Sequence, residues 1–426
     1  MEAATNRARR SGWSVIAVAM LFQAWTIGTI QYAFTFWIDP WMIEFDATRT
    51  ELILPILVAQ IGTTLLAPIA GHAMDHWPLG RLCAMGLVAF SIGLLGTILA
   101  DAPWQIVLCY GPLMAVAMAL TGPLMGQTLA TKWFREGRGM AMGWVTTGTS
   151  LGGLLVPPMI AWLILHHGWR VASAVPAAGA LVVLLPVVLF VLRTPPPNSP
   201  PPSAAPDEVN EEAPGESGDE GAKLTTLEIV RQRAFWVTAL GFIPGWGLIS
   251  AVQINFGPYT SDLGVEPQRA AFFVSLISGS MIAGKLAFGA LADRLDFRVT
   301  FSIVVGMLGL ALLAMAASPS PELLIPVCIA IGLGGGGLLP LSGLILAGHF
   351  GDALFGRVMG LFYLAFAAAS ITAPLAGAIR DRFGSYDPFW LAMATVLVVA
   401  GLPLLLLRPT DAKDAQDSER RRGDPD

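Results

Sequence analysis

The chain has 426 residues, of which 54% are apolar and 13% charged, and its formal net charge is −5. Soluble proteins average about 25% charged residues, so this composition excludes an ordinary water-soluble fold and indicates a chain surrounded by lipid. The acidic balance and the scattered basic residues argue against nucleic-acid binding. The three cysteines lie in apolar runs without C-x-x-C spacing, so neither a disulfide framework nor a zinc site is expected.

Twelve apolar stretches along the chain are long enough to cross a bilayer as helices, which takes about 20 residues each. The first could be mistaken for a signal peptide, but it is too long and lacks an A-x-A cleavage site, so we expect it to be retained. The predicted spans are 13–38, 51–74, 81–101, 103–131, 138–165, 170–192, 234–262, 269–292, 299–317, 321–349, 356–379 and 386–407.

The segment 193–232 separates the sixth span from the seventh and is Pro-rich and acidic. Such sequence predicts a disordered linker, because it buries too little apolar surface to fold. We therefore expect an all-α membrane protein with a six-helix bundle at 1–192, the linker at 193–232, a second bundle at 233–408 and a disordered tail at 409–426.

The lysines and arginines predict the orientation, since basic residues in short loops stay in the cytoplasm. Placing both termini and the linker inside puts 19 of the 25 basic residues in the cytoplasm, five outside, and Lys285 within a span. This asymmetry indicates an even number of spans with both termini cytoplasmic, in what we expect to be a bacterial inner membrane.

The two predicted bundles show an internal repeat. At an offset of 218, Pro40, Gly71 and Asp75 align with Pro258, Gly289 and Asp293; at 217, Pro123, Gly143 and Pro157 align with Pro340, Gly360 and Pro374. Parallel repeats in membrane proteins are typical of transporters in which one half moves against the other.

The segment from Gly71 to Arg81 follows the second span and resembles the signature loop G-x-x-x-D-R/K-x-G-R/K of the major facilitator superfamily, with a second-half echo from Gly289 to Arg298. The resemblance implies a cytoplasmic gate whose charges change partners between states, with Asp75 pairing with a basic residue of the next loop, best Arg138. His76 stands where the family usually has Arg or Lys. The gating candidates are Asp75, Arg81, Arg138, Asp293, Arg294 and Arg298; the alternative is that these are loop charges that anchor the topology.

Two further strings narrow the resemblance. The run from Phe34 to Glu51 looks like the F-x-x-P…E-F…R-x-E stretch of the monocarboxylate porters and their oxalate-formate antiporter relatives. Phe256 to Gly264 is similar to that family's P-Y-x-x-D-L-G. The resemblance implies a small carboxylate as substrate.

Lys285 is the basic residue that falls inside a predicted span. A charge at this depth costs about 2.5–3.5 kcal/mol on insertion scales, so by default it faces the bundle interior and carries function. In the resembled family a cation four residues before the Gly of the D-R loop binds the substrate carboxylate, and Lys285 stands four before Gly289. The alternative is that Lys285 extends to the headgroups.

Other polar residues within spans are weaker candidates for substrate contacts, because interhelical hydrogen bonds commonly use the same residue types. Tyr32, Gln127, Asn255 and Tyr363 are the ones we select. Thr146, Thr147 and Ser150, with the glycines around them, are interpreted first as close helix packing. Asp39 is a candidate proton site; alternatively it caps the entry of helix 1.

These observations predict a secondary transporter that moves a small organic anion, a monocarboxylate by resemblance, by alternating access and without a cofactor, since the sequence has no Walker motif. It is not expected to be an enzyme, and a monomer surrounded by lipid is expected. The alternatives are a facilitator for a drug, aromatic compound or vitamin, and a membrane sensor whose linker binds a partner.

Overall fold

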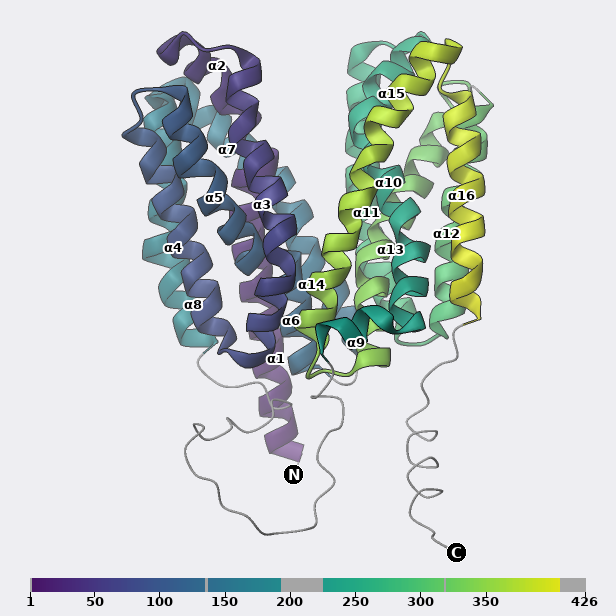
Figure 1. The fold of residues 1–426 in the computed structure, drawn as a ribbon, viewed down its shortest axis with the longest axis horizontal. Coiled ribbons are helices and arrows are strands. Elements are labelled where there is room, and N and C mark those ends of the chain that lie inside the picture. The colour runs from purple at the N-terminus through teal and green to yellow at the C-terminus, as the bar shows by residue number, and fades with distance from the viewer. Residues whose placement is uncertain (1, 135–136, 193–224, 318, 407–426) are drawn as a thin grey trace, which may run out of the picture.

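The computed structural model describes residues 2–134, 137–192, 225–317 and 319–406, which form helices in two bundles (Figure 1). The first half contains α1 (Glu2–Ile27), η1 (Gly28–Tyr32), α2 (Thr35–Phe45), α3 (Arg49–His76), α4 (Leu79–Ile98), α5 (Pro103–Thr121), α6 (Pro123–Trp133), α7 (Arg138–Gly179), η2 (Ala180–Leu184) and α8 (Leu185–Val191). The second contains α9 (Thr226–Arg231), α10 (Arg233–Asp262), α11 (Pro267–Ala292), α12 (Phe297–Ala316), α13 (Leu324–Phe350), α14 (Phe355–Ala365), η4 (Phe366–Ile371), α15 (Thr372–Phe383) and α16 (Asp387–Leu405).

Local sequence explains several helix boundaries. Thr48 and Glu51 form a capping box at the start of α3, which satisfies amides that have no partner within the helix. Gly122 adopts an extended conformation and separates α5 from α6, which begins at Pro123. Gly168 has a φ of 80°, a conformation that favours glycine, and it breaks the long helix α7 in two.

The break at Gly168 reconciles the predicted and observed spans. Within the described residues, eleven helical stretches are long and apolar enough to cross a membrane, and one of them, Arg138–Val191, has 54 residues. This stretch holds the fifth and sixth predicted spans. The twelve-helix, two-bundle fold predicted from the sequence is therefore confirmed.

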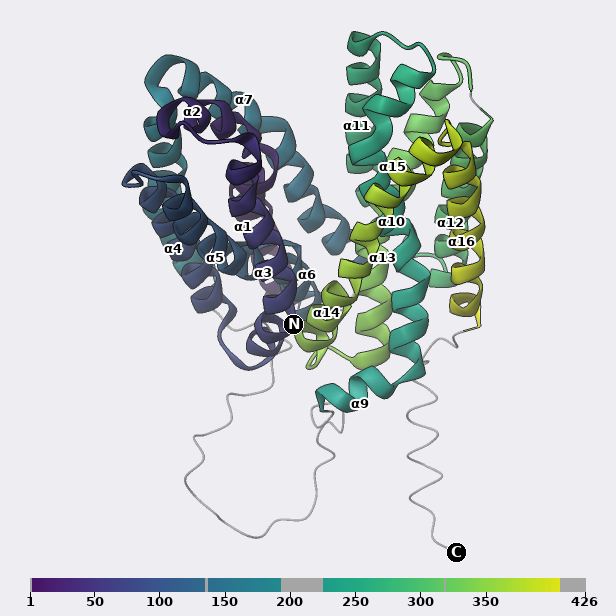
Figure 2. The same ribbon diagram turned by 45° about the horizontal axis from the view of Figure 1, so that its top comes forward.

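Two predicted boundaries differ from the structure. The first predicted span, 13–38, is interrupted after Tyr32, and α2 is a separate helix at one end of the bundle (Figures 1 and 2). Residues 193–224 of the predicted linker and the whole predicted tail, 409–426, lie outside the described residues. The prediction of disorder was wrong for Thr226–Arg231. These residues form α9, which begins with a capping box made by Thr225 and Glu228. These hydrogen bonds hold the pKa of the Glu228 carboxyl below its ordinary value.

Large apolar side chains cover the outside of both bundles. Leu65 and Leu165 of the first half and Leu310 of the second, for example, are 62%, 80% and 70% exposed. A water-soluble protein would bury such a surface, whereas lipid solvates it. The chain is therefore a multi-pass integral membrane protein.

The two halves meet at one end of the molecule. There α3 packs against α14 and α7 packs against α11, so each contact joins one helix of each half. This is the end at which the first half finishes at Leu192 and α9 begins the second; we call it the linker end. At the opposite end, which carries α2 and α15, the halves diverge in both views (Figures 1 and 2).

Candidate functional site

Lys285 joins the two halves through hydrogen bonds of its side chain. It lies on α11, is 5% exposed, and its Nζ donates hydrogen bonds to the Thr146 carbonyl at 2.8 Å, Thr149 Oγ1 at 2.8 Å and Ser150 Oγ at 2.7 Å. All three acceptors are on α7. Lys285 therefore faces the bundle interior, and the alternative that it extends to the headgroups was wrong.

Within the described residues, no neighbouring carboxylate balances the charge of Lys285. Its three acceptors are neutral oxygens, and among the described residues it forms no ion pair within 4.0 Å. A buried ammonium without an acid favours an anion beside it, since that anion supplies the missing charge.

Close backbone contacts hold the linker end shut. A Cβ on Gly71 would overlap the carbonyl oxygen of Gly356, and a Cβ on Gly139 would overlap that of Gly289. Because glycine has no side chain, α3 approaches α14 and α7 approaches α11 at backbone distance. The two pairs are equivalent in the repeat.

Two carboxylates strengthen these contacts. Asp75 accepts hydrogen bonds from the backbone N–H groups of Gly356 at 2.9 Å and Arg357 at 2.8 Å. Asp293 accepts from those of Gly139 at 2.7 Å and Met140 at 2.8 Å. Each carboxylate thus satisfies amides in the first turn of a helix in the opposite half, where the helix dipole favours a negative charge.

The expected pairing of Asp75 with Arg138 was wrong for this conformation. Arg138 instead forms an ion pair with Asp352 of the second half at 2.7 Å, and its Nε donates to the Phe134 carbonyl at 2.9 Å. Asp75 is already occupied by amides of α14, so Arg138 takes the carboxylate in the loop before that helix. Both residues nevertheless lie at the contact between the halves, and their role in a gate stays a prediction.

Besides Asp352, the residues Arg357, His72 and Lys132 at the linker end were not among the predicted candidates. Arg357 is 8% exposed, and its Nε donates to His72 Nδ1 at 3.1 Å. Lys132 donates to the Met74 carbonyl at 2.6 Å and interacts electrostatically with Asp75. The repeat would have identified Arg357, because it aligns with Met140 directly after the glycine pair.

The remaining gating candidates take no part in the contacts between the halves described above. Arg81 and Arg294 are exposed. Arg298 is the second residue of α12; its N–H donates to Asp296 at 2.8 Å and its guanidinium lies 5.8 Å from the Phe297 ring centre. Their roles stay predictions.

The predicted substrate contacts lie in different surroundings. Gln127 bridges the halves: its Nε2 donates to the Leu339 carbonyl at 2.7 Å and its Oε1 accepts from the Tyr363 hydroxyl at 3.4 Å. Asn255 donates to the Ala373 carbonyl at 3.0 Å and so joins α10 to α15 within the second half. Tyr32 is 41% exposed and its ring passes over Gly153 of α7, one turn beyond Ser150.

Asp39, the candidate proton site, lies on the surface of α2. It is exposed and occupies the fifth position of α2, whose N-cap is Phe34. The alternative that Asp39 caps a helix was therefore wrong, and its role as a proton site stays a prediction.

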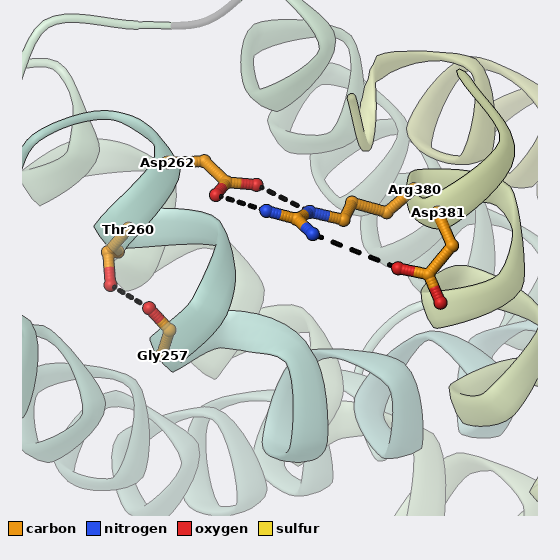
Figure 3. A network of polar contacts seen from close by, with 5 residues as sticks. All are labelled: Gly257, Thr260, Asp262, Arg380 and Asp381. Carbon is orange, nitrogen blue, oxygen red and sulfur yellow. Dashed lines mark hydrogen bonds and ion pairs between the residues drawn. The ribbon is translucent and has the colours of Figure 1, made fainter. Parts of the chain in front are cut away.

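At the end opposite the linker end, each ion pair forms between residues of the same half. Arg380 binds Asp262 through Nε at 3.1 Å and Nη2 at 2.9 Å, and lies 3.7 Å from Asp381 (Figure 3). Arg170 pairs with Glu44 at 2.7 Å and holds the pKa of that carboxyl below its ordinary value, chiefly through this hydrogen bond. These pairs stabilise each bundle without joining the two.

Comparison with known proteins agrees with this architecture. The profile described as Major Facilitator Superfamily matches residues 15–316 and 250–425. Monocarboxylate transporter 13 of Bos taurus is 26% identical over 409 residues, covering 93% of this chain and 89% of the relative. Monocarboxylate transporter 12 of Homo sapiens is 24% identical over 433 residues, covering 94% and 83%.

Solved structures show the same fold. The crystal structure of the transporter FucP in the outward conformation superposes with a TM-score of 0.71 at 14% identity, covering 91% of this chain and 96% of that chain. Two bundles that meet at the linker end, together with the family match, define a transporter rather than an enzyme. The chain belongs to the Major Facilitator Superfamily and resembles its monocarboxylate transporters.

Proposed function

We propose that this transporter carries a small organic anion, a monocarboxylate, across the inner membrane, and that Lys285 is its anion site. The observation that carries the proposal is the buried ammonium of Lys285, which is bonded to three neutral oxygens. A carboxylate beside it would restore charge balance at a position where neither charge is well solvated by water.

The position of Lys285 also suits alternating access. It lies on α11 about two turns from the linker end, and it contacts α7 of the opposite half. A substrate bound here would touch both halves and would affect the contact that has to open. In our proposal the linker end is cytoplasmic, so the present conformation is open to the outside.

Uptake into proteoliposomes tests the proposal. Radiolabelled lactate, pyruvate and acetate are compared with a neutral sugar and a neutral aromatic compound. We expect uptake of the acids, a loss of roughly tenfold or more in Lys285→Gln, and partial retention in Lys285→Arg, which keeps the charge with a different geometry. An imposed pH gradient tests proton symport in the same vesicles.

Two results would overturn the assignment. Carboxylate uptake that is unchanged in Lys285→Gln would remove Lys285 from the site. Uptake of the neutral compounds in preference to the acids would favour a facilitator for another solute. Melting temperatures of the purified variants serve as the control for folding.

A further inference from the structure

The Lys285 ammonium has no N–H left for a substrate. A lysine ammonium has three N–H donors, and the Thr146 carbonyl, Thr149 hydroxyl and Ser150 hydroxyl accept one each, at 2.7–2.8 Å. A carboxylate that binds Lys285 directly must therefore displace at least one of these oxygens. The two hydroxyls are the displaceable partners, because a side chain can rotate whereas the carbonyl is fixed in the helix.

The internal repeat shows that packing does not require these hydroxyls. Lys285 aligns with Ala67 at the offset of 218, and at 217 Thr149 and Ser150 align with Phe366 and Ala367. The backbone contact is the same in both halves: Gly143 meets the Lys285 carbonyl, and Gly360 meets that of Ala67. The equivalent contact between α3 and α14 has neither the lysine nor the two hydroxyls. The hydroxyls therefore occur together with the ammonium and are not needed for the backbone contact.

The bonds of Lys285 belong to the contact that holds the linker end shut. A Cβ on Gly143 would overlap the Lys285 carbonyl oxygen, so the residue lies within the close approach of α7 to α11. Opening the linker end separates these helices, and the three bonds from Lys285 then break or lengthen. In the substrate-free protein they therefore favour the closed linker end.

We propose that Thr149 and Ser150 are positioning residues that hold the Lys285 ammonium in the substrate-free protein, keep α7 on α11, and release the ammonium to the substrate carboxylate. The first part concerns the empty protein alone, whereas the release to a carboxylate rests on the proposed function. Binding of an anion thus replaces a bond between the halves and lowers the barrier to opening.

Distances between spin labels measure the opening without any substrate. Labels at Phe190→Cys and Val299→Cys lie on the exposed surfaces of α8 and α12, 77% and 48% exposed, in a background in which Cys83, Cys109 and Cys328 are replaced by Ala. In Thr149→Val/Ser150→Ala, which keeps the side-chain volumes, we expect the open-to-closed ratio to rise about tenfold or more, because hydrogen bonds to a charged group are lost.

Matched variants separate this role from general packing. Thr147 is also a buried threonine of α7, and its hydroxyl bonds the Gly143 carbonyl of its own helix at 2.9 Å, so Thr147→Val should leave the ratio unchanged. Thr149→Ser retains a hydroxyl and should behave as the wild type. An unchanged ratio in the double variant, or an equal rise in Thr147→Val, overturns the positioning role.

Addition of carboxylates to the spin-labelled protein tests whether the Lys285 ammonium is released to a substrate. Pyruvate, lactate and acetate are each added to the wild type and to Lys285→Gln, and at least one acid should shift the wild type toward the open linker end without shifting Lys285→Gln. If the double variant shifts the ratio but none of these acids does, the positioning role stands and the release to a carboxylate fails with the proposed function. If Lys285 is needed for uptake but the double variant is unchanged, the proposed function stands and the positioning role fails.

Discussion

Asp75 and Asp293 make equivalent contacts from opposite halves of the molecule. Each carboxylate accepts two backbone N–H groups at the start of a helix in the other half, at 2.7–2.9 Å. The signature loop thus joins the halves through a carboxylate and a helix N-terminus rather than through an ion pair with Arg138. Both contacts exist at the linker end when it is closed, so they stabilise this state directly.

Removing these charges should open the linker end. A negative charge at a helix N-terminus typically contributes about 0.3–1 kcal/mol, and up to about 2 kcal/mol where it is partly buried, so Asp75→Asn and Asp293→Asn should each raise the open population several-fold. Met142 is fully buried and contacts the Gly343 position across the boundary. The alkylation rate of Met142→Cys by a water-soluble maleimide therefore reports the opening.

Asp296 provides the matched control for this experiment. It caps α12 through the Arg298 N–H at 2.8 Å, and both residues are in the second half. Asp296→Asn removes the same charge at a helix N-terminus within one half, so it should lower the thermal stability slightly and leave the alkylation rate near that of the wild type. Equal rates in Asp296→Asn and Asp293→Asn would show that the loss of any negative charge at a helix N-terminus, rather than of a contact between halves, causes the effect.

Gly289 should tolerate no side chain in the closed state. A Cβ there would overlap the Gly139 carbonyl oxygen, and overpacking of this kind typically costs about 1–3 kcal/mol. We expect Gly289→Ala to populate the open linker end and to slow transport, measured as alkylation at Met142→Cys and as uptake. Gly348→Ala is the control, since a Cβ at this helical glycine meets nothing within 4 Å; equal effects of the two variants would contradict the explanation.

The sequence predicted the fold because bilayer thickness imposes a length on each helix. Runs of about 20 apolar residues located the spans, and the repeat of Gly71 and Asp75 at Gly289 and Asp293 located the contact between the halves. The burial of Lys285 followed from the cost of its charge in lipid. These inferences rest on the local sequence and its solvent or on the repeat, and none of them needs the identity of a partner.

Partners across the boundary could not be predicted in the same way. Asp75 binds backbone amides, which every residue has, so the sequence does not identify them. Thr149 was overlooked and Ser150 was interpreted as packing, because their acceptor role depends on a lysine about 135 residues away. The exposure of Asp39 depends on the break after Tyr32, and no proline or glycine stands at Ala33 or Phe34 to indicate it.

The ion pair between Arg138 and Asp352 should contribute to closure. The side chains are 13% and 24% exposed, so the pair is partly shielded from water and is expected to contribute on the order of 1 kcal/mol. Arg138→Asp and Asp352→Arg should each favour the open linker end, and the double swap should recover part of the loss. Recovery stays incomplete because Arg138 also donates to the Phe134 and Thr131 carbonyls.

A second ion pair serves as the comparison for the swap. Arg380 and Asp262 are bonded in a bidentate manner within the second half (Figure 3), so Arg380→Asp/Asp262→Arg should alter thermal stability but not the spin-label distance between Phe190→Cys and Val299→Cys. A change in that distance with this swap, or additive effects of the two Arg138 and Asp352 single variants in the cycle, would contradict the assignment.

Gln127 and Tyr363 should differ in their effect on closure, although they contact each other. The Gln127 amide donates to the Leu339 carbonyl at 2.7 Å, whereas the Tyr363 hydroxyl is 3.4 Å from Gln127 Oε1. A short, buried hydrogen bond contributes about 1 kcal/mol and a long one less. Gln127→Leu should therefore raise the open-to-closed ratio of the spin-labelled protein about fivefold, and Tyr363→Phe less than twofold. A larger effect of Tyr363→Phe would mean that the hydroxyl acts on another group, and a substrate contact would then be the first role to test, by measuring the uptake KM of that variant.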